Sequence, residues 1–323
     1  MKKIILNSFG ETNKMILKDE PDRLPKDNEV LVKHVAIGVN YIDIYHRTGL
    51  YPLKLPTGLG LEASGVVESV GENVNSFKIG DRVCYCNGPI GAYSSHNLVP
   101  ENLLLHLPKE IDFDIISGGL LKGLTAYFLL HDVYQVGKND TILFHAAAGG
   151  VGSIAIAWAK SLGAKVIGTV GTDEKLKYAK SLGCDDVINY NLKSFKDEVL
   201  SITDNVGVSV VYDSIGKQTI TDSMDCLSRR GLLVSFGNAS GPADSIDVLD
   251  LMKKGSLYVT RPTLFDYVKS REQLEIASSA LFKALANKQV SIDVNQVFNL
   301  SDVAKAHETI AKRETIGATI LKL

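Results

Sequence analysis

The chain has 323 residues, more than one typical domain needs, so two domains are the natural expectation. Hydrophobic residues make up 45% of the chain and the formal net charge is −2, which gives no electrostatic reason to bind nucleic acid or an anionic membrane. No apolar run approaches the length of a membrane span, and the apolar run after Met1 is too short for a signal peptide. These features predict a soluble, cytoplasmic protein.

The first third of the chain is typical of an antiparallel, barrel-like β domain. Apolar and polar residues alternate over 29–35, 65–70 and 81–85, and the first ten residues read as another strand. Turn signals stand between these segments, at 71–73 and at 80–81. Short alternating strands separated by turns indicate a barrel or a sandwich.

From about Leu121 the pattern changes to strands that alternate with helices, which predicts a doubly wound parallel sheet. The expected strands are 141–144, 165–170, 186–188, 208–213, 232–236 and 257–260, and the expected helices are 153–161, 174–182, 194–202 and 217–227. The last segment, from Arg271, holds a helix near 272–287, a helix that opens at Ser301-Asp302 and a last strand at 319–323. It does not extend the parallel sheet, so the order suggests one domain inserted in another.

The segment 141–152, T-I-L-F-H-A-A-A-G-G-V-G, is a strand that stops at small residues directly before a helix. Ala147, Gly149 and Gly152 take the three places of the dinucleotide fingerprint G-x-G-x-x-G. A turn without side chains lets the backbone approach a diphosphate, and the helix behind it offers free N–H groups and a positive dipole end. The sequence therefore predicts a dinucleotide-binding turn.

The end of the second predicted strand indicates which dinucleotide is bound. NAD-binding folds place an acid there to hold the ribose 2′-OH, and Gly171 stands at that place. We interpret Asp173 and Glu174 as first-turn residues of the next helix, with Thr172 as its N-cap. Thr172 can donate a hydrogen bond to a 2′-phosphate and Lys175 can supply a charge, so NADPH is favoured over NADH. The alternative for Lys175 is an ordinary solvated lysine.

The four cysteines do not form a metal motif. Only Cys84 and Cys86 lie close together, and no set of four has zinc-knuckle spacing. A metal pair at these two positions is possible in a strand, but we interpret both as small strand residues. We therefore predict no metal site and no disulfide framework.

Over its whole length the chain resembles the medium-chain dehydrogenase/reductase superfamily, and within it the zinc-free NADPH:quinone oxidoreductases of the ζ-crystallin-like branch. The resemblance is carried by V-N-Y-I-D at 39–43, R-T-G-L-Y-P at 47–52, G-L-G-L-E-A-S-G at 58–65, G-D-R-V at 80–83, K-G-L-T-A-Y at 122–127, H-A-A-A-G-G-V-G at 145–152, V-I-N-Y at 187–190, V-Y-D-S-I-G at 211–216, S-F-G-N at 235–238 and S-L-Y-V-T-R-P at 256–262. It implies an α/β protein in which a GroES-like β-barrel catalytic domain is built from both chain ends around a central Rossmann domain. The implied boundaries are 1–122, 123–262 and 263–323, the last segment completing the catalytic domain.

Two departures from the zinc-dependent relatives bear on the chemistry. Those relatives place a cysteine where Asn40 stands and a G-H-E motif where Gly60-Leu61-Glu62 stands. An amide cannot replace a thiolate ligand, and Leu61 cannot coordinate zinc. Reduction of a conjugated, electron-poor acceptor needs less Lewis-acid help than alcohol oxidation, so a quinone or an enone is the expected substrate.

The resemblance also implies roles for single residues. Tyr190 and Lys175 are placed by the adenosine 2′-phosphate, with Gly171 leaving them room. The other implied cofactor contacts are Gly150 and Val151 at the diphosphate, Thr125 at the nicotinamide ribose, Asn238 and Arg261 near the nicotinamide half, and Arg313 from the C-terminal segment. Each has a structural alternative: a half-buried aromatic for Tyr190, an exposed or interface arginine for Arg261, and a turn residue for Asn238.

Asn40, Tyr45 and Tyr51 are the candidates for the substrate pocket. The Asn40 amide can orient a carbonyl or the nicotinamide ribose. A tyrosine can stack on a flat ring and pass it a proton, although ordinary packing explains either tyrosine equally well. We interpret His145 as a hydrogen-bonded histidine at a strand end and Glu62 as a structural acceptor.

The expected reaction is transfer of a hydride, or of single electrons, from NADPH to a planar quinone without zinc. In this interpretation the domains position cofactor and acceptor in the cleft between them and exclude water. One alternative is a 2-alkenal, enone or enoyl-thioester reductase on the same scaffold. A non-enzymatic alternative is a structural or RNA-binding protein, but no basic patch supports it. Relatives also suggest a homodimer that pairs through the strand at 256–260.

Overall fold

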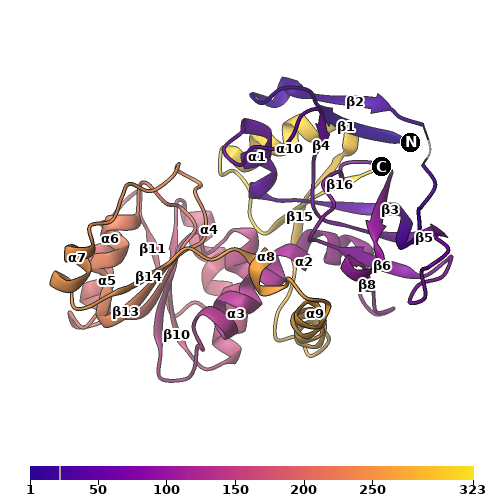
Figure 1. Ribbon diagram of the computed structural model, residues 1–323. Coiled ribbons are helices and arrows are strands. Elements are labelled where there is room, and N and C mark those ends of the chain that lie inside the picture. Colours follow the sequence, from indigo (N-terminus) through magenta and orange to yellow (C-terminus); the bar gives the residue numbers. More distant parts are fainter. Residues whose placement is uncertain (22) are drawn as a thin grey trace. The chain divides into compact units, whose positions relative to one another are not determined.

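The computed structural model describes residues 1–21 and 23–323, which form two compact units. The first unit comprises residues 1–122, 270–282 and 292–323, and the second comprises 123–269 and 283–291. Both ends of the chain lie in the first unit (Figure 1). The functional boundaries expected at 122/123 and 262/263 remain a prediction.

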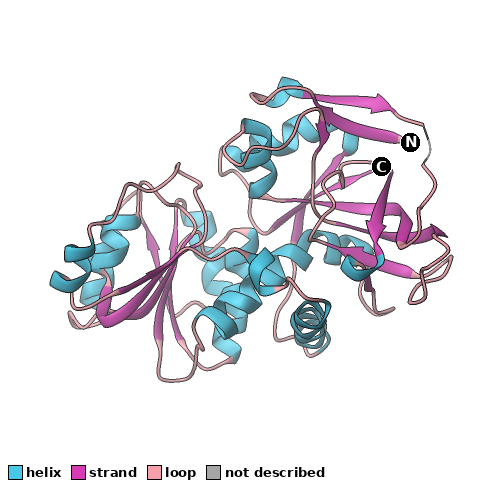
Figure 2. Ribbon diagram, viewed as in Figure 1, coloured by secondary structure: helices cyan, strands magenta, loops and turns pink. Residues whose placement is uncertain are grey.

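The first unit is built on a seven-stranded sheet and a three-stranded sheet (Figure 2). The larger sheet has the order β15-β16-β3-β5-β6-β8, with β7 also paired to β3, and the smaller has the order β2-β1-β4. Neighbouring strands run antiparallel except for β15 and β16, which are parallel. The strands are β1 Lys2–Leu6, β2 Met15–Asp19, β3 Glu29–Val39, β4 Thr57–Gly58, β5 Ala63–Val70, β6 Arg82–Tyr85, β7 His96–Pro100, β8 Leu105–His106, β15 Val294–Asn299 and β16 Ala318–Lys322.

The alternation expected at 29–35 belongs to β3, the strand that organises the first unit. It pairs with β5 on one side and with β7 and β16 on the other, and its apolar residues join the buried core. Gly65 in β5 lies so close to this strand that a Cβ atom would fall 2.0 Å from the carbonyl oxygen of Lys33. The last strand, expected at 319–323, is β16 and closes onto β3 rather than onto the parallel sheet.

The first unit also holds helices that the alternation pattern did not predict. Helix α1 (Tyr41–Thr48) starts directly after β3, where Asn40 and Asp43 form a capping box, and ends at Gly49 with φ +83°. The remaining helical segments that begin in this unit are η1 Thr12–Lys14, η2 Glu101–Leu103, α2 Phe113–Tyr127, α9 Arg271–Ala286, η4 Leu300–Asp302 and α10 Val303–Ala311. The helix expected near 272–287 is α9, and the one expected to open at Ser301-Asp302 is η4 followed by α10.

The second unit is a six-stranded parallel sheet of order β11-β10-β9-β12-β13-β14, as the α/β alternation predicted. The chain order reverses between β9 and β12, which is where doubly wound sheets bind their ligands. Its strands are β9 Thr141–Phe144, β10 Lys165–Val170, β11 Asp186–Asn189, β12 Val208–Asp213, β13 Leu227–Ser235 and β14 Tyr258–Thr260. Its helices are the π-helical η3 Phe128–Val133, α3 Gly150–Ser161, α4 Asp173–Ser181, α5 Phe195–Ile202, α6 Ile220–Asp225, α7 Val248–Lys253 and α8 Leu264–Tyr267.

Two expected elements of the second unit have markedly different bounds. The helix expected over 217–227 is only α6, because the Asp213 carboxylate accepts hydrogen bonds from the backbone N–H groups of Ile215 and Gly216 and holds a loop there. The strand expected at 232–236 begins earlier, at Leu227, and its pairing with β12 is interrupted by a register shift. Loop chemistry of this kind depends on contacts that a local pattern does not contain.

One helical stretch, Phe113–Val133, is long and apolar enough to cross a bilayer by length and composition alone. In its most apolar 18-residue window, 72% of the residues are buried inside the protein. Core helices of folded domains meet the same criteria, so this stretch is weak evidence for a membrane segment.

Candidate active site

The predicted dinucleotide turn lies between β9 and α3. Ala146 has a φ of +53°, a left-handed conformation that is uncommon outside glycine. A Cβ atom at Gly152 would lie 2.4 Å from the Ala146 carbonyl oxygen, so only glycine fits at this point of α3. The close approach of helix and turn is the geometry that the fingerprint predicted.

The start of α3 can accept an anion. Gly149 is the N-cap and supplies no side-chain cap, and the first turn, Gly150 to Gly152, contains no acid. The first intrahelical bond at this end runs from the Ser153 N–H to the Gly149 carbonyl, at 2.8 Å. The N–H groups of the preceding residues have no partner within the helix, as at any helix start, and they form the positive end of the helix dipole. These residues fit the diphosphate of a dinucleotide.

The residues predicted for the 2′-phosphate lie together at the ends of β10 and β11. Val170 and Asn189 are paired across these strands, which brings Gly171 beside Tyr190. A Cβ atom at Gly171 would lie 2.8 Å from the Tyr190 hydroxyl oxygen. Thr172 is the N-cap of α4, and its hydroxyl accepts a hydrogen bond from the Lys175 N–H at 3.3 Å. Because Gly171 has no side chain, there is space beside it, and the Tyr190 hydroxyl lies at the edge of that space.

The interpretation of Asp173 as a helix residue is confirmed. Asp173 is the first residue of α4, and its carboxylate accepts a hydrogen bond of 2.9 Å from the Asn189 side chain. The Asn191 side chain in turn donates to the Gly171 carbonyl at 2.7 Å. Asp173 is therefore already engaged within the protein and does not take the place of the acid that NAD-binding folds use.

The other predicted cofactor contacts are distributed over both units. Thr125 lies buried in α2, Asn238 lies in the turn that follows β13, and Arg261 follows β14 and donates to the Pro262 carbonyl at 3.1 Å. These three belong to the second unit, whereas Arg313 belongs to the first. The charge of Arg313 acts on Tyr41, where it opposes the rise in pKa that burial causes.

A buried hydrogen-bond network lies directly before the dinucleotide turn. The Ser223 hydroxyl donates to the Asp213 carboxylate at 2.8 Å, so it accepts from His145 Nε2, 2.9 Å away. His145 Nδ1 then accepts from the Thr169 hydroxyl at 2.8 Å. Both ring nitrogens are bonded in a neutral ring, and burial lowers the His145 pKa. The interpretation of His145 as a hydrogen-bonded strand-end residue is confirmed.

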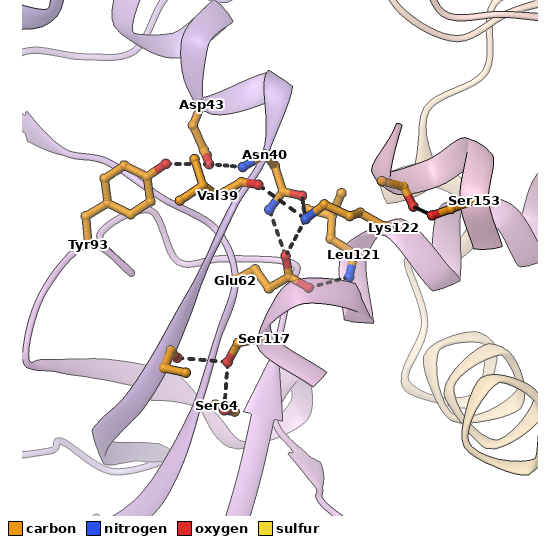
Figure 3. A network of polar contacts seen from close by, with 12 residues as sticks. Val39, Asn40, Asp43, Glu62, Ser64, Tyr93, Ser117, Leu121, Lys122 and Ser153 are labelled. Atoms are coloured by element: carbon orange, nitrogen blue, oxygen red, sulfur yellow. Dashed lines mark hydrogen bonds and ion pairs between the residues drawn. The ribbon is translucent and has the colours of Figure 1, made fainter. Parts of the chain in front are cut away.

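In the first unit, Asn40 stands at the centre of a buried polar network (Figure 3). Its side-chain nitrogen donates to Glu62 Oε2 at 2.7 Å, and its side-chain oxygen accepts from Lys122 Nζ at 2.7 Å. Glu62 Oε1 accepts from the Leu121 N–H at 2.7 Å, which agrees with the interpretation of Glu62 as an acceptor. Asn40 is 4% exposed, Glu62 0% and Lys122 7%, so the bonds are shielded from water.

The Glu62 carboxylate is held against β3 because Gly38 has no side chain. A Cβ atom at Gly38 would fall 2.3 Å from Glu62 Oε2. Burial raises the pKa of Glu62 and lowers that of Lys122, while the charge of each group opposes the shift of the other. The pair lies 3.7 Å apart, and we describe it as a buried ion pair.

Asp43 extends this network toward α10. Its Oδ2 accepts from the Asn40 backbone N–H and from the Tyr93 hydroxyl, both at 2.8 Å, and the Tyr93 oxygen lies 3.0 Å from His307 Nε2. Burial raises the pKa of Asp43 to about 7 and lowers that of His307 to about 3. Among the described residues, Asp43 Oδ1 and His307 Nδ1 are buried without a hydrogen-bond partner.

Sequence reasoning missed Lys122, Asp43, Tyr93 and His307 as parts of the site. Asp43 carried a usable signal, since Asn-x-x-Asp is a capping-box spacing directly after a strand. Lys122 lies in the quoted K-G-L-T-A-Y motif, but nothing local connects it with Asn40, 82 positions away. Tyr93 and His307 are 214 positions apart and gave no signal.

Tyr45 and Tyr51 lie beside one another in the first unit. Their rings are 5.0 Å apart in an edge-to-face arrangement, and Tyr41 packs against Tyr45 at 5.3 Å. Tyr45 is 8% exposed, so packing accounts for most of its surface, whereas Tyr51 is half-buried. The structure therefore brings both tyrosines together on and directly after α1, the helix that Asn40 caps.

The residues around Asn40 do not fit zinc. The ligand position of zinc-dependent relatives carries an amide here, and that amide already binds an ammonium group. Cys84 and Cys86 are buried, and burial raises the pKa of both thiols, which disfavours the thiolate form that binds metal. Within residues 1–21 and 23–323, no group of three or more His, Cys, Asp or Glu side chains is placed to hold a metal ion.

Comparison with known proteins agrees with this geometry. Residues 26–109 match the family model "Alcohol dehydrogenase GroES-like domain", and residues 150–276 match "Zinc-binding dehydrogenase". A quinone oxidoreductase of Pseudomonas aeruginosa is 46% identical over 99% of both chains. A 2-haloacrylate reductase of a Burkholderia species is 43% identical over 98% of this chain and 97% of its own. The crystal structure of Escherichia coli quinone oxidoreductase complexed with NADPH covers 100% of both chains at 44% identity, with a TM-score of 0.98.

A GroES-like unit built from both chain ends and a Rossmann unit with a glycine turn define the medium-chain dehydrogenase/reductase fold. The expected fold class is confirmed. Identities of 46–48% over 92–99% of each chain also show the family within this superfamily. The chain belongs to the quinone oxidoreductase family of that superfamily.

The raised pKa of Asp43 predicts a specific pH dependence of stability. The native state holds a proton on this carboxyl up to about pH 7, whereas the unfolded chain releases it near pH 4, so its contribution to stability is lost as pH rises through this window. We expect Asp43→Asn, which stays neutral, to gain stability relative to the parent between pH 4 and 8, by up to about 4 kcal/mol. Urea unfolding at each pH measures the difference.

Asp19→Asn, at an exposed position of β2, serves as the control for the loss of one carboxylate. His307, whose pKa shift has the opposite sign, is present in both proteins and cancels in the comparison. A constant difference between parent and Asp43→Asn from pH 4 to 8 would show that Asp43 is not protonated in the native protein.

Proposed function

We propose that the protein catalyses NADPH-dependent reduction of quinones without a metal. The observation that carries the proposal is the combination of an acid-free helix start at α3 with Gly171 beside Tyr190, at the places that bind diphosphate and ribose in dinucleotide folds. Relatives named quinone oxidoreductases at 46–48% identity, and one solved with NADPH, support the choice of acceptor and cofactor.

In this proposal the second unit binds the cofactor. The N–H groups at Gly150, Val151 and Gly152 hold the diphosphate, and Ala147 and Gly149 shape the turn. Thr172 and Lys175 bind the 2′-phosphate, which the missing acid at Gly171 admits. The remaining proposed contacts are Tyr190 at the adenosine, Thr125 at the nicotinamide ribose, and Asn238, Arg261 and Arg313 on the nicotinamide side.

The first unit orients the acceptor. NADPH, when bound, supplies a hydride, and the chain contributes positioning and the exclusion of water. Asn40 offers one unengaged amide N–H to a carbonyl oxygen, while Tyr45 and Tyr51 offer ring faces for stacking and a hydroxyl for proton donation. The residues around Asn40 do not fit zinc, so the acceptor must already be electron-poor.

A second candidate activity is reduction of an activated carbon–carbon double bond. The relative named 2-haloacrylate reductase, at 43% identity over nearly the whole chain, is the observation that favours it. Such a substrate shares the electron-poor character of a quinone but has a different shape. The cytoplasmic location and the lack of nucleic-acid and membrane partners remain predictions.

We also propose that the protein is a homodimer through the edge of the parallel sheet. Strand β14 lies at the end of that sheet, and Tyr258 on it is 61% exposed. Helix α7, which precedes β14, exposes Val248, Leu249 and Met252 by 76%, 57% and 62%. An unpaired strand edge next to exposed apolar side chains favours pairing with a second copy.

The acceptor is tested by steady-state oxidation of NADPH with 1,4-benzoquinone, 9,10-phenanthrenequinone, crotonaldehyde and 2-chloroacrylate side by side. We expect the highest kcat/KM with a quinone and no change after EDTA, because the proposed site contains no metal. Gly152→Ala is the control for a specific cofactor site, since its Cβ atom would clash with the Ala146 carbonyl. Preference for crotonaldehyde or 2-chloroacrylate would establish the second candidate, and turnover with none would refute both.

The cofactor preference is tested by the double variant Gly171→Asp with Lys175→Glu. The new carboxylates repel a 2′-phosphate and can bind a ribose 2′-OH, so we expect the preference to change from NADPH to NADH. Each charge-assisted hydrogen bond lost corresponds to about 1.5–3 kcal/mol, or roughly a ten- to hundredfold change in the preference for NADPH over NADH. Gly171→Ala, which displaces Tyr190 equally without adding charge, should keep the preference for NADPH. A kcat/KM for NADPH within twofold of the parent value would contradict the assignment.

The dimer is tested by sedimentation velocity of the parent and of Tyr258→Lys with Met252→Lys. We expect a dimer for the parent at micromolar concentration and a monomer for the variant, because two lysines oppose the burial of this edge. Ile79→Lys, at a site of the first unit that is 69% exposed, should leave the dimer intact. A monomeric parent would refute the proposal.

A further inference from the structure

We propose that Lys122 is a positioning residue of the reductase: its ammonium group holds the Asn40 amide in one orientation and leaves one amide N–H to bind the acceptor oxygen. The proposal rests on the quinone reductase function proposed above. It concerns a lysine that lies next to the site residues in space and far from them in sequence (Figure 3).

The Lys122 ammonium group lies among three oxygen atoms. Lys122 Nζ lies 2.7 Å from Asn40 Oδ1, 3.2 Å from the Val39 carbonyl oxygen and 3.7 Å from Glu62 Oε2. An ammonium group has three donors and no acceptor, so it can face only oxygen atoms in this position. With the lysine side chain 8% exposed, water does not compete strongly for these donors.

The charges on both sides of Asn40 determine which way its amide points. The amide oxygen faces the ammonium and the amide nitrogen faces the carboxylate of Glu62. A flipped amide would place its N–H groups against Lys122 and its oxygen against Glu62, so both contacts would become repulsive. After these two bonds, the amide retains one N–H for a ligand.

Groups other than Lys122 hold the Glu62 carboxylate in position. Its two oxygens accept from the Leu121 N–H and from the Asn40 side chain, and Gly38 gives the carboxylate its space on β3. A buried ion pair can often be replaced by neutral groups with little loss of stability, so charge balance alone does not require a lysine here. The charge-assisted bond to the Asn40 oxygen comes from Lys122.

The two explanations of Lys122, as counter-ion and as positioning residue, are separated by charge-balanced variants. Lys122→Met removes the donor and leaves Glu62 buried without a counter-ion. Lys122→Met with Glu62→Gln removes the donor as well but restores neutrality, and it also frees the amide to flip. Lys305→Met, which breaks an exposed ion pair with Asp302 in the same unit, is the matched control.

Four quantities are measured for each purified full-length protein: Tm, the NADPH Kd from cofactor fluorescence, kcat/KM with 1,4-benzoquinone, and the isotope effect with NADPH deuterated at the transferred position. We expect Lys122→Met to lose stability and about tenfold or more in kcat/KM, the loss of one charge-assisted hydrogen bond. The double variant should regain the parent Tm but not kcat/KM, with the NADPH Kd within about twofold of the parent. The isotope effect should increase, because a poorly oriented acceptor makes hydride transfer slower.

Recovery of parent kcat/KM in the double variant would overturn the proposal and leave Lys122 as a counter-ion. An unchanged isotope effect with a weaker NADPH Kd would also overturn it, since Lys122 would then act on cofactor binding. If Lys122→Met fails to fold, the double variant alone decides between these outcomes. An inactive parent enzyme would refute the proposed function and this proposal together, whereas an active parent with a recovered double variant refutes only this proposal.

Discussion

The Glu62 carboxylate is the contact on which the polar interior of the first unit depends. It joins three segments, because Gly38 of β3 provides its space, Leu121 of α2 donates to one oxygen and Asn40 at the start of α1 donates to the other. A carboxylate buried at 0% exposure is tolerated only when its lone pairs and its charge are satisfied. The lysine that balances it arrives on the same helix as the Leu121 N–H, so docking α2 supplies both requirements at once. The orientation of Asn40 then follows from these constraints.

The second unit is organised by the absence of side chains rather than by charge. Gly152 allows α3 to approach the Ala146 carbonyl, and Gly171 leaves the space beside the Tyr190 hydroxyl. Under the turn, His145 links Thr169 with Ser223 and Asp213 by hydrogen bonds at both ring nitrogens. This network ties the ends of β9, β10 and β12, the strands around the reversal of chain order.

The difference between the units explains how much of the site the sequence could predict. The dinucleotide turn, Gly171 and the N-cap Thr172 are local patterns, and the sequence sufficed to place them on the correct strands and helices. Helix α1 escaped prediction because it is short and its cap follows a long strand directly. The partners of Asn40 escaped prediction because Glu62 lies 22 positions away and Lys122 lies 82 positions away. Only the pairing of β3 with β5 and the docking of α2 bring them together.

A lysine at this place also gives a physical reason why the residues around Asn40 do not fit zinc. The ammonium of Lys122 provides the positive charge at this place, 3.7 Å from Glu62 and bonded to the Asn40 amide. An ammonium with its donors committed to Val39, Asn40 and Glu62 cannot polarise a substrate as an open metal site does. The buried charges of Glu62 and Lys122 therefore balance each other within the protein, in agreement with the proposed use of acceptors that are electron-poor before they bind.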